Sequence, residues 1–335
     1  MPPAPAPIVR VDVVSSLEPQ VRAEVRALVE DAERADGFPG LSDQAQLATE
    51  DGAPDGAISL LAPEGVAGDA ANAASDELAG YASLRHEPGQ DGGWTIETVV
   101  RPERRGDAAD VLGALLDAAL VEVGARGGGA VRAWLRADLA RGAEKMAARG
   151  LQPTRELLQL RAPLPPEAVR DASSPPLAVR PFRPGRDEQA WLEVNARAFA
   201  SHPEQGRWTL EDLTRREREP WFDPGGFLLH EVGGRLAGFC WTKVHLNPVL
   251  GEIYVIGVDP DFQGRGLGRA LTRAGLGHLA TRGVPTAMLY VESTNTPALV
   301  LYRSLGFTEH HREVQFSATA AAGAQGDAPT ARPIP

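Results

Sequence analysis

The sequence predicts an α/β protein of two tandem domains, each a mixed, twisted sheet flanked by helices. The main observation is an internal repeat: Leu-Ala-Gly-Tyr at 78–81 matches Leu-Ala-Gly-Phe at 236–239, an offset of 236 − 78 = 158. Arg-Gly-Leu at 149–151 matches Leu-Gly-Phe at 305–307 with an offset of 156. In each copy, strands lead into a helix, a strand, a second helix and a final strand. Antiparallel strands followed by a strand–helix–strand crossover give a mixed sheet.

The second copy shows this order of elements most clearly. We expect strands at 227–231, 235–245 and 252–258, a helix at 266–282, a strand at 286–292, a helix at 296–305 and a strand at 308–315. Each copy is expected to begin with a strand, at 8–14 and at 177–182. The small polar residues of 62–75 predict a loop.

Two segments lack the regular spacing of apolar residues that helices and strands show, and they set the predicted domain boundaries. The stretch 162–176 holds five prolines and predicts a linker, and the Ala/Gly/Pro-rich segment 317–335 predicts a disordered tail. We therefore expect an N-terminal domain at 1–161 and a C-terminal domain at 177–316. A chain of 335 residues is long enough for two domains of ordinary size.

The composition excludes several classes of function. A net charge of −11 argues against nucleic-acid binding, which needs a basic surface. The apolar runs are strand-sized and the chain does not begin with a signal pattern, so we expect a cytoplasmic protein that does not enter the membrane. We also expect a monomer. The seven histidines are scattered and predict no metal site. Cys240, the single cysteine, lies in an apolar run and is interpreted as a small buried residue rather than a nucleophile.

The segment with the clearest chemistry is a glycine-rich turn after the strand at 252–258. Gln-Gly-Arg-Gly-Leu-Gly at 263–268 follows Val-Asp-Pro at 258–260 and opens an amphipathic helix. Glycine lets the backbone approach a ligand closely, and a helix N-terminus attracts anions, so the turn predicts a pyrophosphate site. The turn lacks the Gly-Lys-Ser/Thr of a P-loop, and its glycine spacing is not that of a Rossmann fold.

The pattern Gln-x-x-Gly-x-Gly after Val-x-Val-Asp-Pro resembles the acetyl-CoA motif of the GNAT acetyltransferase superfamily. Asn295 and the later Tyr-Arg-Ser-Leu-Gly-Phe at 302–307 match the same superfamily. Within it, the chain resembles the tandem-domain mycothiol synthase family, densely over 177–316 and thinly over the first half. The matching segments are His-Pro-Glu-Gln-Gly at 202–206, Trp-Thr-Lys-Val-His at 241–245, Gly-Glu-Ile-Tyr-Val at 251–255 and Tyr-Val-Glu-Ser at 290–293.

This resemblance implies transfer of acetyl from acetyl-CoA to the cysteinyl amine of Cys-glucosaminyl-inositol (Cys-GlcN-Ins), the last step of mycothiol synthesis. Two alternatives stay open. In the first alternative the chain is a GNAT enzyme for another small-molecule or protein amine. In the second it is a non-catalytic acetyl-CoA sensor. Intact candidate catalytic residues speak against the sensor.

Two side chains are candidates for catalysis. An amine attacks a thioester only when it is unprotonated, so a base must take its proton. Glu252 is the expected base because it precedes the cofactor turn on the face shared with Tyr254, Ile256 and Val258. Backbone N–H groups near Val258 would polarise the thioester carbonyl. Tyr302 matches the family's acid for the departing thiolate. A solvent-facing glutamate and a core tyrosine are the alternative interpretations.

The resemblance also places both ligands. Contacts to acetyl-CoA are expected from Ile256, Gly257, Val258, Gln263, Gly264, Arg265, Gly266, Leu267, Gly268, Arg269, Asn295, Thr296, Pro297, Ala298, Leu299 and Val300. Contacts to the acceptor are expected from Asp43, Glu204, Lys243, Glu252 and Tyr290. Lys243 is one of only two lysines in the chain, and this scarcity supports a specific role for it. The alternative interpretation is a surface lysine.

The first copy departs from the pattern at the catalytic positions. With the offsets above, Trp94 stands in the place of Glu252 (94 + 158 = 252), and Met146 in the place of Tyr302 (146 + 156 = 302). We therefore expect only the second copy to perform chemistry.

The cofactor turn of the first copy has also changed. Of the three motif glycines only Gly106 remains, with Ala108 and Asp110 at the other two positions, and Asp107 adds a second carboxylate that would face a pyrophosphate. The strand positions that still have the means to contact the pantetheine of acetyl-CoA are Thr98, Val99 and Val100.

Overall fold

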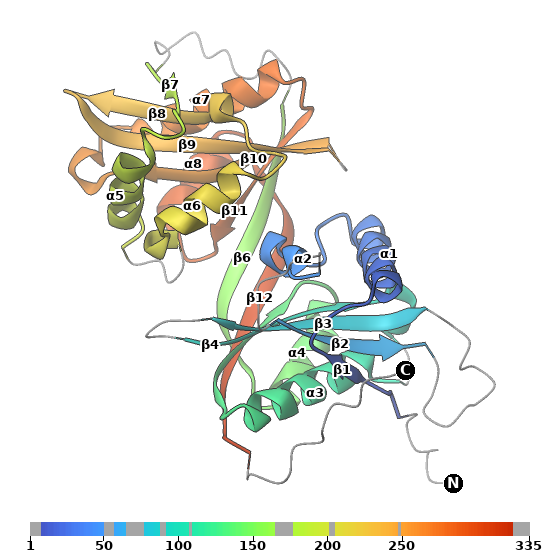
Figure 1. The fold of residues 1–335 in the computed structure, drawn as a ribbon. Helices are drawn as coiled ribbons and strands as arrows, with labels where there is room; N and C mark the ends of the chain where they lie inside the picture. The colour runs from blue at the N-terminus through green and yellow to red at the C-terminus, as the bar shows by residue number, and fades with distance from the viewer. Residues whose placement is uncertain are drawn as a thin grey trace. The chain divides into compact units, whose positions relative to one another are not determined.

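The computed structural model describes residues 8–49, 57–64, 77–87, 92–106, 109–164, 177–200, 205–246 and 249–323. The chain forms two compact units, each with a mixed α/β sheet (Figure 1). Unit 1 consists of Met1–Glu156 and Arg312–Pro335, and unit 2 of Leu157–His311. None of the helices in the described ranges is long and apolar enough to cross a membrane.

Unit 1 contains the elements of the first copy and the last strand of the chain. They are β1 (Asp12–Val14), α1 (Pro19–Asp36), α2 (Asp43–Leu47), β2 (Ile58–Pro63), β3 (Leu78–Glu87), β4 (Gly93–Val100), the 3-10 turn η1 (Pro102–Arg104), α3 (Val111–Ala125), β5 (Gly129–Leu135), α4 (Leu139–Ala148) and most of β12 (Thr308–Ala320). The strand order is β1-β2-β3-β4-β5-β12. Among the strand pairs in the described part of unit 1, β4 and β5 are the parallel pair, as the predicted crossover requires.

Helices cover both faces of the unit 1 sheet. Val25 and Leu28 of α1 pack with Tyr81 and Val99 of the sheet, and α3 and α4 pack against the opposite face in a separate cluster. Alternate side chains of β4 therefore enter different layers, which is the period of two expected of a strand buried on both faces.

Unit 2 begins within a strand that follows the first copy. Its elements are β6 (Gln152–Pro163), β7 (Arg180–Pro181), α5 (Glu188–Ala198), η2 (Gln205–Arg207), α6 (Leu210–Glu217), η3 (Pro224–Gly226), β8 (Phe227–Val232), β9 (Arg235–Leu246), β10 (Val249–Val258), η4 (Pro260–Phe262), α7 (Leu267–Thr281), β11 (Thr286–Glu292) and α8 (Thr296–Ser304). The strand order is β6-β11-β10-β9-β8-β7, with β10 and β11 parallel.

The unit 2 sheet also lies between two helical layers. Helices α7 and α8 pack on one face, where Leu271, Leu279 and Tyr302 meet Cys240 and Ile253. Helices α5 and α6 pack on the other face in a cluster rich in aromatic side chains, including Trp191, Trp241 and Phe239. The predicted α/β class, with a mixed sheet in each copy, is confirmed.

Each sheet is completed by a strand from the other half of the chain. In unit 1, β5 pairs with residues 314–320 of β12, and in unit 2, β11 pairs with residues 157–163 of β6. The units therefore differ from the predicted domains at 1–161 and 177–316. The two copies carry similar strand patterns, so the pattern does not choose which sheet edge receives each final strand.

Two further details differ from the predictions. Strand β12 continues through Ala320, so residues 317–320 of the predicted tail pair with β5. The first strand of each copy is shorter than predicted, because only Asp12–Val14 and Arg180–Pro181 pair over consecutive residues. Residues 165–176 of the linker, 65–75 of the loop and 324–335 of the tail lie outside the described ranges.

Candidate active site

A β-bulge in β10 positions the candidate base. Glu252 pairs with Lys243 of β9 and Ile253 with Thr242, but the next pair joins Val255 to Trp241, so Tyr254 is the extra residue. A bulge reverses the alternation of side chains beyond it. The prediction that Glu252 shares its face with Ile256 and Val258 is therefore wrong.

Packing of the side chains beyond the bulge shows the same reversal. Val255 and Tyr254 belong to the aromatic cluster under α5 and α6. Ile256 and Val258 pack on the opposite face, with α7 and α8. Glu252 itself is buried, with 7% of its surface exposed, so it is not a solvent-facing strand residue.

The bulge also corrects the alignment of the two copies. Glu252 pairs with Met288 of β11, and the equivalent of Met288 in the first copy, Arg132, pairs with Thr95. Thr95, not Trp94, therefore stands in the place of Glu252. Strand β4 pairs with β3 without a register shift, and a constant sequence offset placed Trp94 there because it ignored the extra residue.

The two parallel strands of unit 2 separate at the bulge. Pairing between β10 and β11 covers Gly251 and Glu252 and stops there. In unit 1 the matching pairing of β4 with β5 continues through Glu97, two residues beyond Thr95. Backbone groups of β10 beyond Glu252 are thus available to a ligand lying along the strand, which is where the thioester was predicted.

Glu252 has a neighbour that the sequence did not single out. His245 Nε2 lies 2.8 Å from Glu252 Oε2, joining the end of β9 to β10. The His245 side chain is 23% exposed and that of Glu252 9% exposed. The sequence contained one indication that His245 belongs to the site: the period of two along a strand places His245 on the same face as Lys243.

Lys243 lies against aromatic rings on this face. Its Nζ is 4.7 Å from the centre of the Trp221 ring and 5.6 Å from that of Tyr254. The residue is only 6% exposed, which contradicts the alternative of a surface lysine. A buried ammonium over aromatic rings is a cation–π arrangement, which holds the charge in a defined place.

Tyr290 lies on the same face of the sheet, on β11. Its hydroxyl accepts a hydrogen bond from Gln159 Nε2 at 2.7 Å, and Gln159 Oε1 accepts one from Arg161 Nε at 2.8 Å. Both partners belong to β6, which pairs with β11 so that Gln159 lies opposite Tyr290. Gln159 and Arg161 were not among the predicted site residues, because they lie in the segment predicted to end the N-terminal domain.

The predicted cofactor turn is exposed between β10 and α7. Gly264 and Gly266 have φ values of 76° and 78°, and a Cβ on either would meet open space, so the backbone conformation alone calls for glycine. Gln263 donates a hydrogen bond to the carbonyl of Val258 at 3.1 Å, which closes the turn. No side chain of the described residues caps α7, so the N–H groups of its first turn are open to an anion.

The second predicted cofactor segment starts α8. Asn295 caps the helix by accepting a hydrogen bond from Ala298 N at 3.2 Å. Thr296, Pro297 and Val300 are exposed, and Leu299 is buried in the core below α8.

Tyr302, on the same helix, faces the core between α7, α8 and the sheet. Burial raises the pKa of Tyr302, and the nearby Cys240 thiol adds to the rise. Its hydroxyl therefore stays protonated at neutral pH, as a proton donor must.

Unit 1 has a hollow beside β4, the counterpart of β10. However, the N-terminus of α3, the counterpart of the open N-terminus of α7, is capped by the side chain of Asp110. Asp110 Oδ1 accepts a hydrogen bond from Gly113 N at 2.9 Å and lies 2.7 Å from Lys145 Nζ. Burial opposes ionisation of Asp110, but the hydrogen bonds from Lys145 and Gly113 outweigh it and lower the pKa. Helix α3 is thus capped by a carboxylate where α7 is open.

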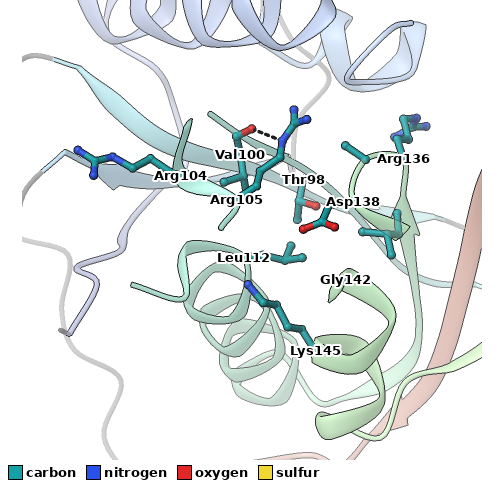
Figure 2. A pocket seen from close by; sticks show the side chains of 11 residues that line it. Thr98, Val100, Arg104, Arg105, Leu112, Arg136, Asp138, Gly142 and Lys145 are labelled. Atoms are coloured by element: carbon teal, nitrogen blue, oxygen red, sulfur yellow. Dashed lines mark hydrogen bonds between the residues drawn. The ribbon is translucent and has the colours of Figure 1, made fainter. Parts of the chain in front are cut away.

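The hollow itself has an empty volume of about 430 Å³, including its mouth (Figure 2). Thr98 and Val100 line it, together with Leu112, Asp138 and Lys145. Val99 points to the other face of the sheet and packs with α1. Of the three strand positions predicted to contact pantetheine, the structure therefore places two side chains at the hollow.

The described part of unit 2 does not contain two of the predicted substrate residues. Glu204 lies outside the described residues, as do Asp107 and Ala108 of the first copy. Asp43 is the first residue of α2 in unit 1 and is exposed. Within the described ranges, no group of three or more His, Cys, Asp or Glu side chains has the arrangement of a metal site.

Comparison with known proteins places this geometry in a family. The model of the acetyltransferase (GNAT) family matches residues 189–307. The mycothiol acetyltransferase of Thermomonospora curvata is 48% identical over 89% of this chain and 94% of its own length, and that of Thermobispora bispora is 46% identical over 92% and 99%. The chain belongs to the mycothiol acetyltransferase family of GNAT proteins. It is therefore an acyltransferase, and the predicted family is confirmed.

Solved structures show the same tandem fold. A GCN5-related N-acetyltransferase from Sphaerobacter thermophilus superposes with a TM-score of 0.67 at 24% identity, covering 94% of this chain and 97% of its own. A tandem GNAT protein from the clavulanic acid biosynthesis pathway superposes with a TM-score of 0.68 at 17% identity over 94% and 100%. At these identities the similarity establishes the fold of the two units alone.

Proposed function

We propose that unit 2 transfers the acetyl group of acetyl-CoA to the cysteinyl amine of Cys-GlcN-Ins, as a cytoplasmic monomer. The main support is Glu252, a buried carboxylate at the point where β10 leaves β11, on the strand that leads through the glycine-rich turn to the open N-terminus of α7. Membership of the mycothiol acetyltransferase family supports this acceptor over other amines.

The residues at the start of α7 fit the pyrophosphate of acetyl-CoA. The run 263–266 is exposed, its glycines adopt positive φ, and the helix dipole adds to the free N–H groups. Arg265 and Arg269 supply positive charge beside the turn. Backbone groups from Ile256 to Val258 would hold the pantetheine, and Asn295 to Val300 would contact the remaining edge.

We assign the acid and base roles to two side chains. Glu252 takes the proton of the amine as the amine nitrogen forms a bond to the acyl carbon and the carbon–sulfur bond breaks. Tyr302, which family resemblance assigns as the acid, donates a proton to the departing thiolate. N–H groups near Val258 stabilise the negative charge that develops on the thioester oxygen.

The face around Glu252 suits a polar acceptor. Lys243 and Tyr290 supply a cation and a hydroxyl group for the sugar, inositol or amide oxygens of Cys-GlcN-Ins. Trp221 and Tyr254 offer aromatic surface beside Lys243. Glu204 and Asp43 are assigned to the acceptor by family resemblance.

Unit 1 is proposed to perform no chemistry. Thr95 and Met146 replace the base and the acid, β4 has no bulge, and Asp110 caps the helix that would bind pyrophosphate. The contribution of unit 1 would be structural. Residues 314–320 of β12, the last strand of the catalytic copy, complete the sheet of unit 1.

The decisive experiment is an assay of the purified full-length chain with acetyl-CoA and a panel of amines. Cys-GlcN-Ins should be acetylated with a kcat/KM at least a hundredfold above that for glucosamine, cysteine and a peptide N-terminus. A better rate with another amine would replace the proposed acceptor. Binding of acetyl-CoA without turnover of any amine would favour a sensor.

A further inference from the structure

His245 is the side chain that holds the proposed base. It projects from the end of β9 on the face that carries Lys243, and its Nε2 lies 2.8 Å from Glu252 Oε2. Because its ring is more exposed than the carboxylate, the pair connects a buried group to a partly solvated one.

The chemistry of the pair fixes the direction of the hydrogen bond. Glu252 acts as a base only as a carboxylate, and a carboxylate only accepts hydrogen bonds. Nε2 of His245 must therefore carry the proton. The bond engages Oε2 of Glu252 and leaves Oε1 as the oxygen for the proton of the amine. It also restricts rotation of the carboxylate, which a glutamate side chain otherwise performs freely.

We propose that His245 is a positioning residue for acetyl transfer: its Nε2–H orients Glu252 and stabilises the ionised carboxylate. The proposal rests on the proposed role of Glu252 as the base. The observation that carries it is the 2.8 Å contact between His245 Nε2 and Glu252 Oε2, which fixes the carboxylate at the end of β9.

Several other charged or titratable groups lie around the pair. Lys243 is opposite Glu252 on β9, Tyr254 forms the bulge, and Tyr290 lies on β11. Helix α7 packs on the other face, where Leu279 meets Gly251.

Helix α5 reaches β10 near Gly257, five residues beyond the base, through Ala198. Lys243, Tyr254 and Tyr290 remain in place when His245 alone is changed. A change in the pH profile of the variant therefore reports the loss of the Nε2–H donor of His245.

The test compares His245→Leu, which removes the donor, with His245→Gln, whose amide places an N–H near the position of Nε2. In His245→Leu we expect kcat to fall about ten- to a hundredfold, the usual effect of removing a hydrogen bond to a charged group. The acidic limb of the kcat–pH profile should move to higher pH, because the carboxylate loses a hydrogen-bond donor. KM for acetyl-CoA should stay unchanged, and His245→Gln should recover most of kcat and the original limb.

A matched control is His230→Leu, since His230 lies in the same sheet and its Nδ1 contacts the carbonyl oxygen of Ala178 at 2.7 Å. This variant should keep the activity and pH profile of the parent. Thermal melting of each variant checks that it is folded. Equal losses in His245→Leu and His245→Gln, with an unmoved acidic limb, would show a merely structural role and overturn the proposal.

A double-mutant cycle with Glu252→Gln separates this proposal from the proposed function. If His245 acts through Glu252, the double variant is no slower than Glu252→Gln alone. Additive losses would overturn the role of His245 while leaving Glu252 as the base. Full activity of Glu252→Gln would instead remove the base, and the proposal for His245 with it.

Discussion

At the scale of single residues, burial distinguishes the charged side chains of unit 2 that are candidates for function from those that are only solvated. Glu252 and Lys243 are 7% and 6% exposed, although both carry charges that water would solvate better. Charged groups are retained in such places when they have specific partners or a function. His245 is the partner of Glu252, and the rings of Trp221 and Tyr254 surround Lys243.

The first prediction tests the base. Glu252→Gln keeps the shape of the side chain and an acceptor for His245, but cannot take a proton. We expect acetyl-CoA affinity near that of the parent and turnover lower by roughly 10²–10⁴, the usual contribution of a positioned proton transfer. Steady-state kinetics with Cys-GlcN-Ins measures this. Glu231→Gln, on the exposed end of β8, is the control and should remain within a few-fold of the parent. Parental turnover of Glu252→Gln at neutral pH would contradict the assignment.

The second prediction concerns Cys240, interpreted from the sequence as a buried residue. Burial raises the pKa of its thiol to about 12, and the side chain is fully enclosed. Since only the thiolate reacts with disulfide reagents, the native protein should remain unlabelled by Ellman's reagent at pH 8 and release one equivalent after denaturation. Rapid labelling of the native protein would show that the region between β9 and α7 opens readily.

At the scale of elements, strand and helix positions were predictable because they depend on local periodicity. Helix α7 was expected at 266–282 and spans Leu267–Thr281. The bulge at Tyr254 was not predictable from that periodicity, because an inserted residue keeps the composition of the strand while reversing its faces. The sequence therefore placed Glu252 correctly beside Tyr254, but it assigned Ile256 and Val258 to the wrong face and chose the wrong counterpart of Glu252 in the first copy.

The third prediction tests the N-terminus of α7. Gly266→Asp introduces a side chain and a negative charge where the N–H groups are open, and should reduce acetyl-CoA binding below detection by calorimetry. Gly283→Asp is the matched control, because Gly283 follows the same helix with a φ of 73° and open space around its Cβ position. Both changes carry a similar backbone cost, so only Gly266→Asp should lose affinity. Unchanged affinity would place the cofactor site elsewhere.

At the scale of the whole molecule, the duplication was predictable but the assignment of the final strands was not. Repeated motifs show that two copies exist, whereas strand partners depend on which sheet edge each strand reaches. Cutting the chain near residue 165 would remove β6 from unit 2 and β12 from unit 1. Each half would then expose an unpaired edge, on β11 or β5, which favours aggregation. The division of labour is therefore tested in the intact chain.

The last prediction is that the full-length chain binds one acetyl-CoA. Asp110 occupies the anion site of α3 through Gly113 and Lys145, whereas α7 has no such cap, so only unit 2 should accept a pyrophosphate. Calorimetry should give one site in the parent and none in Gly266→Asp. Gly106→Asp, the corresponding kind of change in unit 1, should keep one site and turnover within a few-fold of the parent, because Gly106 is exposed and its φ is not positive. Two sites in the parent, with one surviving in Gly266→Asp, would show that unit 1 binds the cofactor despite Asp110.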